Sequence, residues 1–253
     1  MFHPPQDEFF YLSYLVTATF SDDLGKKIEK LATAFVLSVG DDPWIITNRH
    51  VIDLNYRQSS PKYRDFSLES ISLTGRKPDD SIYQIELLKN SRVIFDEEYQ
   101  NDVAMILPRS DSANAEKLHW HFGINHLAND DDFNNIKPFD LVYYTGFPPQ
   151  HDKLASRQIG RSGRIASDPR FNYSWDNIDR GDCVAYEGFS FGGSSGSPIF
   201  TPHKGLHGIT DARNAFLIGL NAGHIPTPEG HSGISYFYKS TVIRRMIQKN
   251  NLL

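Results

Sequence analysis

A loop of small residues followed by an apolar strand is the first part of this sequence that could support covalent chemistry. The stretch GGSSGSPIF covers residues 192–200. A flexible Gly/Ser linker usually repeats and has no apolar strand directly behind it. A phosphate-binding loop needs a lysine after its glycines and a helix behind them, and this stretch has neither. The remaining interpretation is a fixed turn that presents a serine together with its backbone amides.

A serine nucleophile needs an imidazole base, a carboxylate that orients the base, and N–H groups that face the developing oxyanion. In the stretch WIITNRHVID (44–53) an apolar strand ends on His50, and in NDVAMILP (101–108) another strand opens with Asp102. Each residue alone has an ordinary structural explanation, as a core histidine, a turn aspartate or a hairpin serine. Their occurrence together, each at a strand, favours a triad of His50, Asp102 and Ser195.

With these motifs the sequence resembles the trypsin-like (chymotrypsin-fold) serine proteases, especially the bacterial, disulfide-free branch that includes the HtrA-type proteases. The resemblance depends on TNRHV around His50, NDVAMILP around Asp102 and GSSGSP around Ser195. Weaker matches are TAFVL, YYTGFP, LIGLNAG and GISYFYKS, whereas residues 109–137 match no part of the family pattern.

The resemblance implies a serine endopeptidase that works through an acyl-enzyme intermediate and needs no cofactor. The reactive position of the family pattern G-x-S-G-x-P falls on Ser195. His50 is then the general base, Asp102 orients it, and the amides of Gly193 and Ser195 form the oxyanion hole. The residue types agree with this assignment, because Gly193 and Gly196 allow backbone conformations that a side chain would obstruct.

The resemblance also indicates a substrate site at residues 189–191, 222–224 and 231–235. Phe189, Ser190 and Phe191 would line it, and the segment Ala222, Gly223 and His224 would pair with the substrate backbone. The three segments contain no acidic residue, so a buried Lys or Arg side chain of the substrate would lack a partner.

Two preferences for the residue before the cleaved bond remain open. A floor made by Phe189 or Phe191 would favour small or medium apolar residues, which is our first expectation. Alternatively, His224 or His231, with Ser190 and Ser235, could bind a carboxylate as in glutamate-specific relatives. The histidine that such relatives place two residues after the glycine of LIGLN is an asparagine here.

Two other functions compete with the peptidase. A catalytically silent peptide-binding or scaffolding protein of the same fold would keep the cleft without turnover, but such a protein is free to lose any triad residue. A cysteine protease of the viral type on this fold would need cysteine at position 195, which is serine. A metal site built from His119, His121, His126 and the aspartates at 130–132 fits no standard ligand spacing, so we expect no metal.

Stretches rich in β-branched and aromatic residues, separated by turn residues, predict an all-β protein. The expected strands are at 10–20, 31–39, 43–48, 67–74, 81–88, 92–96 and 102–108, and then at 138–148, 157–167, 182–188, 197–201, 214–222 and 232–238. A terminal helix is expected at 240–250, with Ser240 as N-cap and an apolar face made by Val242, Ile243, Met246 and Ile247.

This pattern predicts two six-stranded antiparallel β-barrels with a C-terminal α-helix. The first barrel, residues 1–108, would carry His50 and Asp102, and the second, residues 138–253, would carry Ser195. Residues 109–137 would form the linker, with a short helix at 112–118. We expect no further peptide-binding domain after the second barrel, and therefore narrow specificity or control by a regulatory partner protein.

The composition of the chain bears on its expected partners and on its location in the cell. The chain has 253 residues, a net charge of −5 and scattered Lys and Arg residues, so nucleic acid is not an expected partner. The apolar stretch at 9–20 is too short and too polar to span a membrane and has no basic leader. The single cysteine, Cys183, cannot form a disulfide within the chain, and we expect it to be buried and structural. These features favour a reducing, cytoplasmic location.

Overall fold

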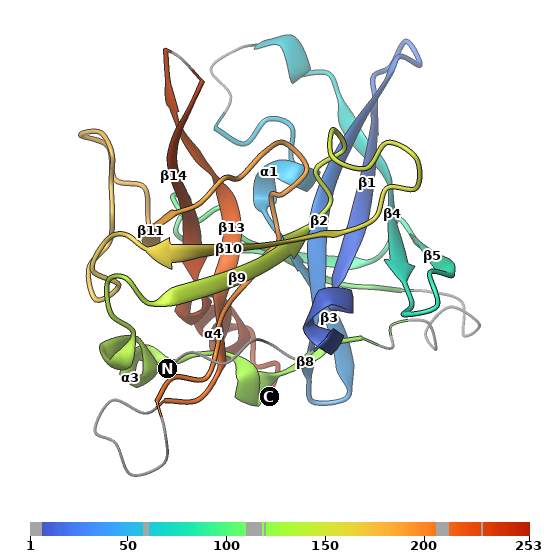
Figure 1. The fold of residues 1–253 in the computed structure, drawn as a ribbon. Helices are drawn as coiled ribbons and strands as arrows, with labels where there is room; N and C mark the ends of the chain where they lie inside the picture. Colours follow the sequence, from blue (N-terminus) through green and yellow to red (C-terminus); the bar gives the residue numbers. More distant parts are fainter. Residues whose placement is uncertain (1–6, 58–60, 110–117, 119, 206–212, 229) are drawn as a thin grey trace.

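A computed structural model describes residues 7–57, 61–109, 118, 120–205, 213–228 and 230–253 of the chain. The protein consists of two β units that lie side by side, with a C-terminal helix packed beneath both (Figure 1). Strands alternate with short turns along the chain, as the sequence predicts, and the described helices are short. The mostly β, chymotrypsin-like fold is therefore confirmed.

The first unit is an eight-stranded sheet with the strand order β5-β4-β1-β2-β3-β7-β6, and β8 pairs with β2. Its strands are β1 (Ser13–Ser21), β2 (Lys27–Val39), β3 (Asp42–Thr47), β4 (Ser67–Arg76), β5 (Ile82–Leu87), β6 (Arg92–Phe95), β7 (Ala104–Leu107) and β8 (Phe122–Gly123). A short helix, α1 (Arg49–Ile52), follows β3, and a 3-10 turn, η2 (Pro61–Tyr63), precedes β4.

The second unit is a closed barrel of six strands in the order β10-β11-β14-β13-β12-β9. Its strands are β9 (Leu141–Gly146), β10 (Ile159–Ile165), β11 (Cys183–Glu187), β12 (Pro198–Thr201), β13 (Phe216–Thr227) and β14 (Gly230–Lys239). All described strand pairs in this barrel are antiparallel.

The first unit has eight strands rather than the six of the predicted barrel: the seven segments predicted before residue 109 and one further strand. The further strand is β8, which lies in the segment predicted to be a linker. It pairs in parallel with Leu37 and Ser38 of β2. The same segment contains a 3-10 turn, η3 (Ile124–His126), and a helix, α3 (Asp130–Asn135). The helix predicted at 112–118 falls almost entirely outside the described residues.

The first strand also begins later than predicted. Residues Asp7–Tyr11 form a 3-10 helix, η1, and β1 starts at Ser13. The ring of Phe9 stacks on Phe200 at 4.9 Å and contacts Phe122 at 6.0 Å, so this turn joins the two units.

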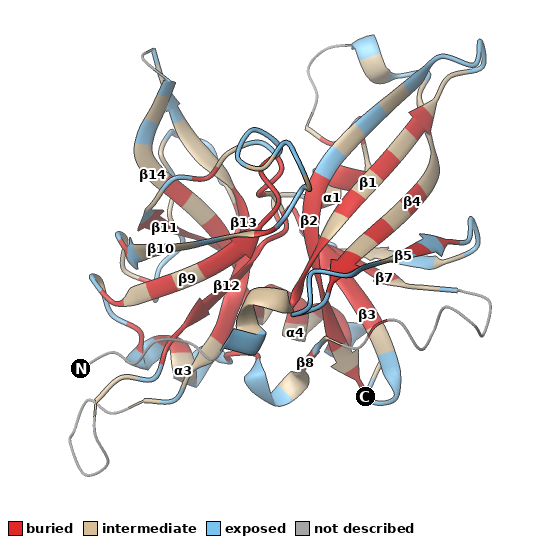
Figure 2. Cartoon of the chain, turned by 45° about the vertical axis from the view of Figure 1, so that its right-hand side comes forward, coloured by how far each residue is buried: buried red, intermediate tan, exposed pale blue. Residues whose placement is uncertain are grey.

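The terminal helix, α4 (Ser240–Lys249), buries the predicted apolar face. Its side chains belong to one core cluster with Trp44 of the first unit and Leu220 of the barrel, so the helix packs on both units (Figure 2). Ser240 is not the N-cap as predicted. Lys239 occupies that position, and the buried Ser240 hydroxyl donates to the carbonyl of Ala128 at 2.8 Å instead. No helix among the described residues is long and apolar enough to cross a membrane.

Candidate active site

His50 and Asp102 meet through two hydrogen bonds. His50 lies in α1, directly after β3, and Asp102 lies just before β7, the neighbour of β3 in the sheet. The Nδ1 of His50 is 2.5 Å from Oδ2 of Asp102, and the backbone N–H of His50 donates to Oδ1 at 2.8 Å. The Asp102 side chain is 7% exposed and that of His50 is 29% exposed. This geometry fixes the ring orientation and leaves the His50 edge accessible.

The three serines of the predicted loop differ in access. Ser194 is 2% exposed and Ser197 is 0% exposed, whereas Ser195 is partly exposed. The Ser195 hydroxyl faces the carbonyl of Ala222 at 3.5 Å. A buried hydroxyl cannot meet a substrate, so Ser195 is the serine of this loop whose side chain a ligand could reach; its role as nucleophile stays a prediction.

Two glycines of this loop occupy positions that no other residue fits. Gly196 has φ +86°, and a Cβ there would lie 1.9 Å from the Thr33 carbonyl oxygen. Gly193 has φ +91°, and a Cβ there would lie 2.3 Å from the Phe147 carbonyl oxygen. Such positive φ angles are strained for residues with a side chain. The backbone can therefore turn sharply on both sides of Ser195.

The backbone amides of Gly193 and Ser195 are available to a ligand. Neither N–H donates a hydrogen bond to any described residue, although the neighbouring amides of Ser194, Gly196 and Ser197 are all bonded. Unpaired amides beside an accessible hydroxyl are the arrangement that can stabilise a developing oxyanion.

The serine loop is held against the first unit by Thr33 of β2. The Thr33 backbone N–H donates to the Ser195 carbonyl at 2.8 Å, and its hydroxyl donates to the Gly193 carbonyl at 2.7 Å. Thr47, three residues before His50, donates its hydroxyl to the Thr33 carbonyl and lines the space beside Gly196. These contacts bring the serine loop close to the His50 segment, from the opposite side of the interface.

A direct hydrogen bond between His50 and Ser195 is absent from the described contacts. Catalytic hydrogen bonds are often long in the free enzyme and tighten when substrate binds, so a site without bound substrate need not show this bond. The side chains that could form it, one accessible hydroxyl and one accessible imidazole, are both present at the interface.

Two cations near the site were not found by sequence reasoning. The Lys30 ammonium donates to the His50 carbonyl at 2.9 Å, and burial lowers the pKa of this lysine. Arg57 donates to the carbonyl of Gln100, two residues before Asp102, and to the Tyr238 hydroxyl of the barrel at 3.1 Å. Neither residue belongs to a recognisable motif, so only their positions in the fold reveal them.

The predicted substrate-site residues do come together, but not as an open apolar pocket. Ser190 is 1% exposed, and its hydroxyl accepts a hydrogen bond from the Asn221 side chain at 2.7 Å. Phe189 is 52% exposed, so it does not form a buried floor. Its ring and that of Phe191 stand beside the ring of His231.

The backbone edge expected to pair with substrate is free. Ala222, Gly223 and His224 lie in β13 beyond Leu220, the last residue that pairs with Pro198 of β12. From there on, β14 is the remaining described neighbour of β13. An extended peptide can add to such an edge as a further strand.

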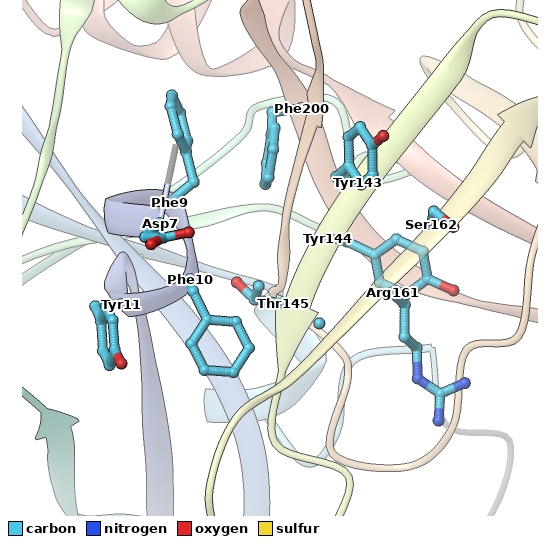
Figure 3. Close-up of a pocket in the computed structure, with 11 residues that line it drawn as sticks. Asp7, Phe9, Phe10, Tyr11, Tyr143, Tyr144, Thr145, Arg161, Ser162 and Phe200 are labelled. Carbon is cyan, nitrogen blue, oxygen red and sulfur yellow. The ribbon is translucent and has the colours of Figure 1, made fainter. Parts of the chain in front are cut away.

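A pocket lies between the N-terminal turn η1 and the second barrel. This pocket of about 510 Å³ separates η1 from strands β9 and β10, and its walls include the aromatic rings of Phe9, Phe10, Tyr143 and Phe200 (Figure 3). Arg161 also lines it, although its guanidinium extends away from these rings. None of the predicted triad residues lines this pocket.

In the described part of the histidine and aspartate cluster at 119–132, side chains form hydrogen bonds with nearby residues of the same segment. His126 accepts the backbone N–H of Gly123 at 3.0 Å, and Asp132 and Asn129 bond reciprocally at the start of α3. Over the described residues, no group of three or more His, Cys, Asp or Glu side chains could hold a metal ion. His119 lies outside the described residues.

The sequence matches the family model described as the trypsin-like peptidase domain over residues 32–209. This range is more than half of the chain and contains His50, Asp102 and Ser195. The chain therefore belongs to the trypsin-like peptidase domain family, whose members are serine peptidases. A search of curated proteins found no match.

Several solved bacterial serine proteases share the fold. The protease Anisep from Arthrobacter nicotinovorans is 12% identical, with a TM-score of 0.61 and coverage of 94% of both chains. The thermostable serine protease AL20 from an extremophilic microorganism is 12% identical, with a TM-score of 0.59 and coverage of 96% of this chain and 99% of that one. The HtrA-type protease AlgW, solved with a decapeptide, is 14% identical at a TM-score of 0.58.

The likeness to AlgW covers 95% of this chain but 64% of the AlgW chain. This chain therefore spans less than two thirds of the length of that HtrA-type protease. At these identities the likeness to all three proteases shows the fold alone.

Proposed function

We propose that this protein is a serine endopeptidase that hydrolyses peptide bonds through Ser195, His50 and Asp102. The observation that carries the proposal is the state of the serine loop, in which an accessible hydroxyl stands beside two amides without a described partner. His50, joined to Asp102 by two hydrogen bonds on the opposite side of the interface, supplies the base.

In the proposed reaction, the Ser195 oxygen attacks the peptide carbonyl while His50 Nε2 takes the hydroxyl proton. Asp102 holds the ring in the required tautomer and stabilises the imidazolium. The Gly193 and Ser195 amides donate to the carbonyl oxygen as it becomes negative. The carbon–nitrogen bond then breaks, His50 returns the proton to the leaving amine, and an acyl-enzyme remains. Water, activated by the same histidine, releases the acid and restores the serine.

The proposed substrate is a protein or peptide that binds as an added strand along β13. The free edge beginning at Ala222 supports this, because the Ala222 carbonyl lies beside the Ser195 hydroxyl. Backbone pairing at this edge would place the scissile carbonyl over the serine. We further propose a reducing, cytoplasmic setting and control by a partner protein; the fully buried thiol of Cys183 and the absence of a second cysteine support the setting.

The decisive experiment is reaction with a fluorophosphonate probe, followed by mass spectrometric mapping of the labelled residue. We expect a covalent adduct on Ser195 and none on the Ser195→Ala variant, with both proteins giving the same circular dichroism spectrum. Labelling at Ser194 or Ser197 would overturn the assignment of the nucleophile. An unlabelled, folded wild-type protein would favour the catalytically silent peptide-binding protein instead.

A further inference from the structure

The rings of His224 and His231 stack on each other within the predicted substrate site. Their centroids are 4.3 Å apart with an interplanar angle of 17°. His224 follows Ala222, whose carbonyl lies beside the Ser195 hydroxyl, by two residues in β13, and His231 comes from the adjacent strand β14. Two stacked imidazoles therefore form one wall of the predicted substrate site.

His231 is held in its neutral form by its surroundings. Its Nδ1 accepts the Gly233 backbone N–H at 2.8 Å, and its Nε2 lies 3.2 Å from the Ser190 backbone N–H and 3.3 Å from the Ser235 hydroxyl. A doubly protonated ring has no lone pair for either amide. Burial, and then the neighbouring His224, also lower the pKa of His231. His231 therefore supports the stack as a neutral ring.

His224 is the ring of the stack whose nitrogens remain free to bind a ligand. The ring is half-buried, and neither of its nitrogens bonds to a described residue. Among the described residues, the histidine that pairs with a carboxylate is His50, not His224. A stacked imidazole with free N–H capacity at the rim of a site is a donor for an anionic ligand.

Arg161 of β10 adds a positive charge that interacts electrostatically with His231. Its guanidinium lies 4.8 Å from the Phe191 ring and donates to the Phe189 carbonyl at 2.9 Å. It also contacts Nε2 of His151 at 2.7 Å, and its buried Nε has no described partner. No described carboxylate forms an ion pair with this guanidinium. The site thus has a cation and two imidazoles without a described counter-charge.

The interior behind this wall is already occupied by polar side chains. The Asn221 side chain donates to the Ser190 hydroxyl at 2.7 Å and accepts from the Tyr186 hydroxyl at 2.8 Å. All three residues are at most 1% exposed. A long apolar side chain of the substrate finds no deep apolar cavity here, whereas a carboxylate can stop at the rim beside His224.

Resting on the serine peptidase activity proposed above, we propose that the enzyme selects an acidic residue, Glu or Asp, immediately before the cleaved bond. The carboxylate accepts a hydrogen bond from His224, which the stacked His231 holds in place. The charge of Arg161 favours the anion over a neutral or cationic side chain. It is the second of the two preferences that the sequence leaves open, and the apolar preference is the alternative outcome of the test.

The test compares four internally quenched peptides that differ only at this position, with Glu, Gln, Leu or Lys. Glu and Gln have nearly the same shape, so their ratio of kcat/KM measures the carboxylate alone. We expect Glu to exceed Gln by about tenfold or more, because hydrogen bonds to charged groups are stronger than neutral ones. Lys should be the poorest substrate.

Three variants locate the effect. His224→Ala should bring the ratio of Glu to Gln close to one, and His224→Gln, which keeps an N–H donor without a charge, should retain at most part of it. His203→Gln, at an exposed histidine outside the site, should leave the ratio unchanged. Fluorophosphonate labelling of Ser195, measured for each variant, shows whether its serine is still reactive, and His203→Gln should label as the wild type does.

Preference for Leu or Lys in a protein that the probe labels would overturn the inference while leaving the proposed peptidase intact. An unchanged ratio of Glu to Gln in a labelled His224→Ala protein would overturn it equally. Absence of both labelling and cleavage in the wild type would remove the proposed peptidase itself, and the inference with it.

Discussion

The backbone N–H of Thr33 donates a hydrogen bond of 2.8 Å to the carbonyl oxygen of Ser195, across the interface between the two β units. The Thr33 hydroxyl adds a bond to the Gly193 carbonyl and accepts the Phe147 backbone N–H at 3.0 Å. A residue of the first sheet therefore sets the position of a loop that belongs to the second barrel. The serine and the histidine can be aligned only when the two units are docked.

Replacing Thr33 by valine should remove the two hydroxyl bonds while keeping the shape of the side chain. Because Thr33 is fully buried, the Gly193 carbonyl and the Phe147 amide would lose a partner without gaining water. We expect a loss of about 1–3 kcal/mol in the free energy of unfolding and slower fluorophosphonate labelling. Thr33→Ser, which keeps the hydroxyl, is the matched control for denaturant unfolding. Equal labelling rates in Thr33→Val and wild type would contradict this role.

The glycines of the serine loop should tolerate alanine very differently. Gly196→Ala places a Cβ 1.9 Å from the Thr33 carbonyl oxygen at φ +86°, so both a clash and backbone strain result. We expect loss of several kcal/mol in stability or a displaced loop that the probe no longer labels. Gly192→Ala is the control, because a Cβ there meets nothing within 4 Å. Thermal unfolding of both variants checks the difference, and similar melting temperatures would count against the loop geometry.

Asp102→Asn should lower turnover by about 10⁴, the loss that the wrong imidazole tautomer causes in triad proteases. The fold should survive, because an amide fits the space of the carboxylate. Steady-state kinetics of the folded variant measures the loss. Turnover equal to that of the wild type would contradict the proposed role of the carboxylate.

Arg57 should matter more than an arginine on the open surface. Its guanidinium ties the segment before Asp102 to Tyr238 of the barrel. Burial lowers the pKa of Arg57, but Tyr238, Tyr56 and, to a smaller extent, Asp102 raise it by more. We expect Arg57→Gln to cost about 1–3 kcal/mol in stability and to reduce kcat. Arg170→Gln, which breaks an exposed ion pair with Asp168, should change stability by less than about 1 kcal/mol. Equal effects of the two substitutions on unfolding would refute the bridging role.

Cys183 should be inert in the native protein. The residue is fully buried in β11, and burial raises the pKa of its thiol to about 12. Since the nucleophilic thiolate is suppressed, a thiol reagent at pH 8 should react far more slowly with the folded than with the unfolded chain. Rapid labelling of the folded protein would show that the thiol is accessible.

The raised pKa of Cys183 also predicts that the stability of the fold depends on pH. The folded pKa lies above the unfolded value of about 8.5, so the fold holds a proton that the unfolded chain releases. The thiol contribution is therefore intact below about pH 8.5 and is lost between there and about pH 12, by at most about 1.4 kcal/mol per pH unit. The slope for Cys183→Ala should be shallower than for wild type in this window.

Local sequence already determined much of this protein. Alternating and β-branched stretches predicted nearly every strand, because the pleat places successive side chains on opposite faces and this leaves a period of two in the chain. The motifs around His50, Asp102 and Ser195 identified the candidate triad, since glycine and serine are needed wherever a tight turn must present a hydroxyl. The apolar face of the terminal helix was likewise readable from its spacing.

The tertiary structure decided everything that depends on residues distant in the chain. Thr33 lies more than 150 residues before the loop it holds, and the stack of His224 on His231 depends on strand register with two bulges. Burial of Ser194 and Ser197, the shift of Ser240 from cap to core, and the pairing of β8 with β2 are also set by packing between elements. A hydrogen bond or stack between distant residues leaves no periodic trace in either segment, because each residue type is ordinary where it stands and only the fold brings the two together.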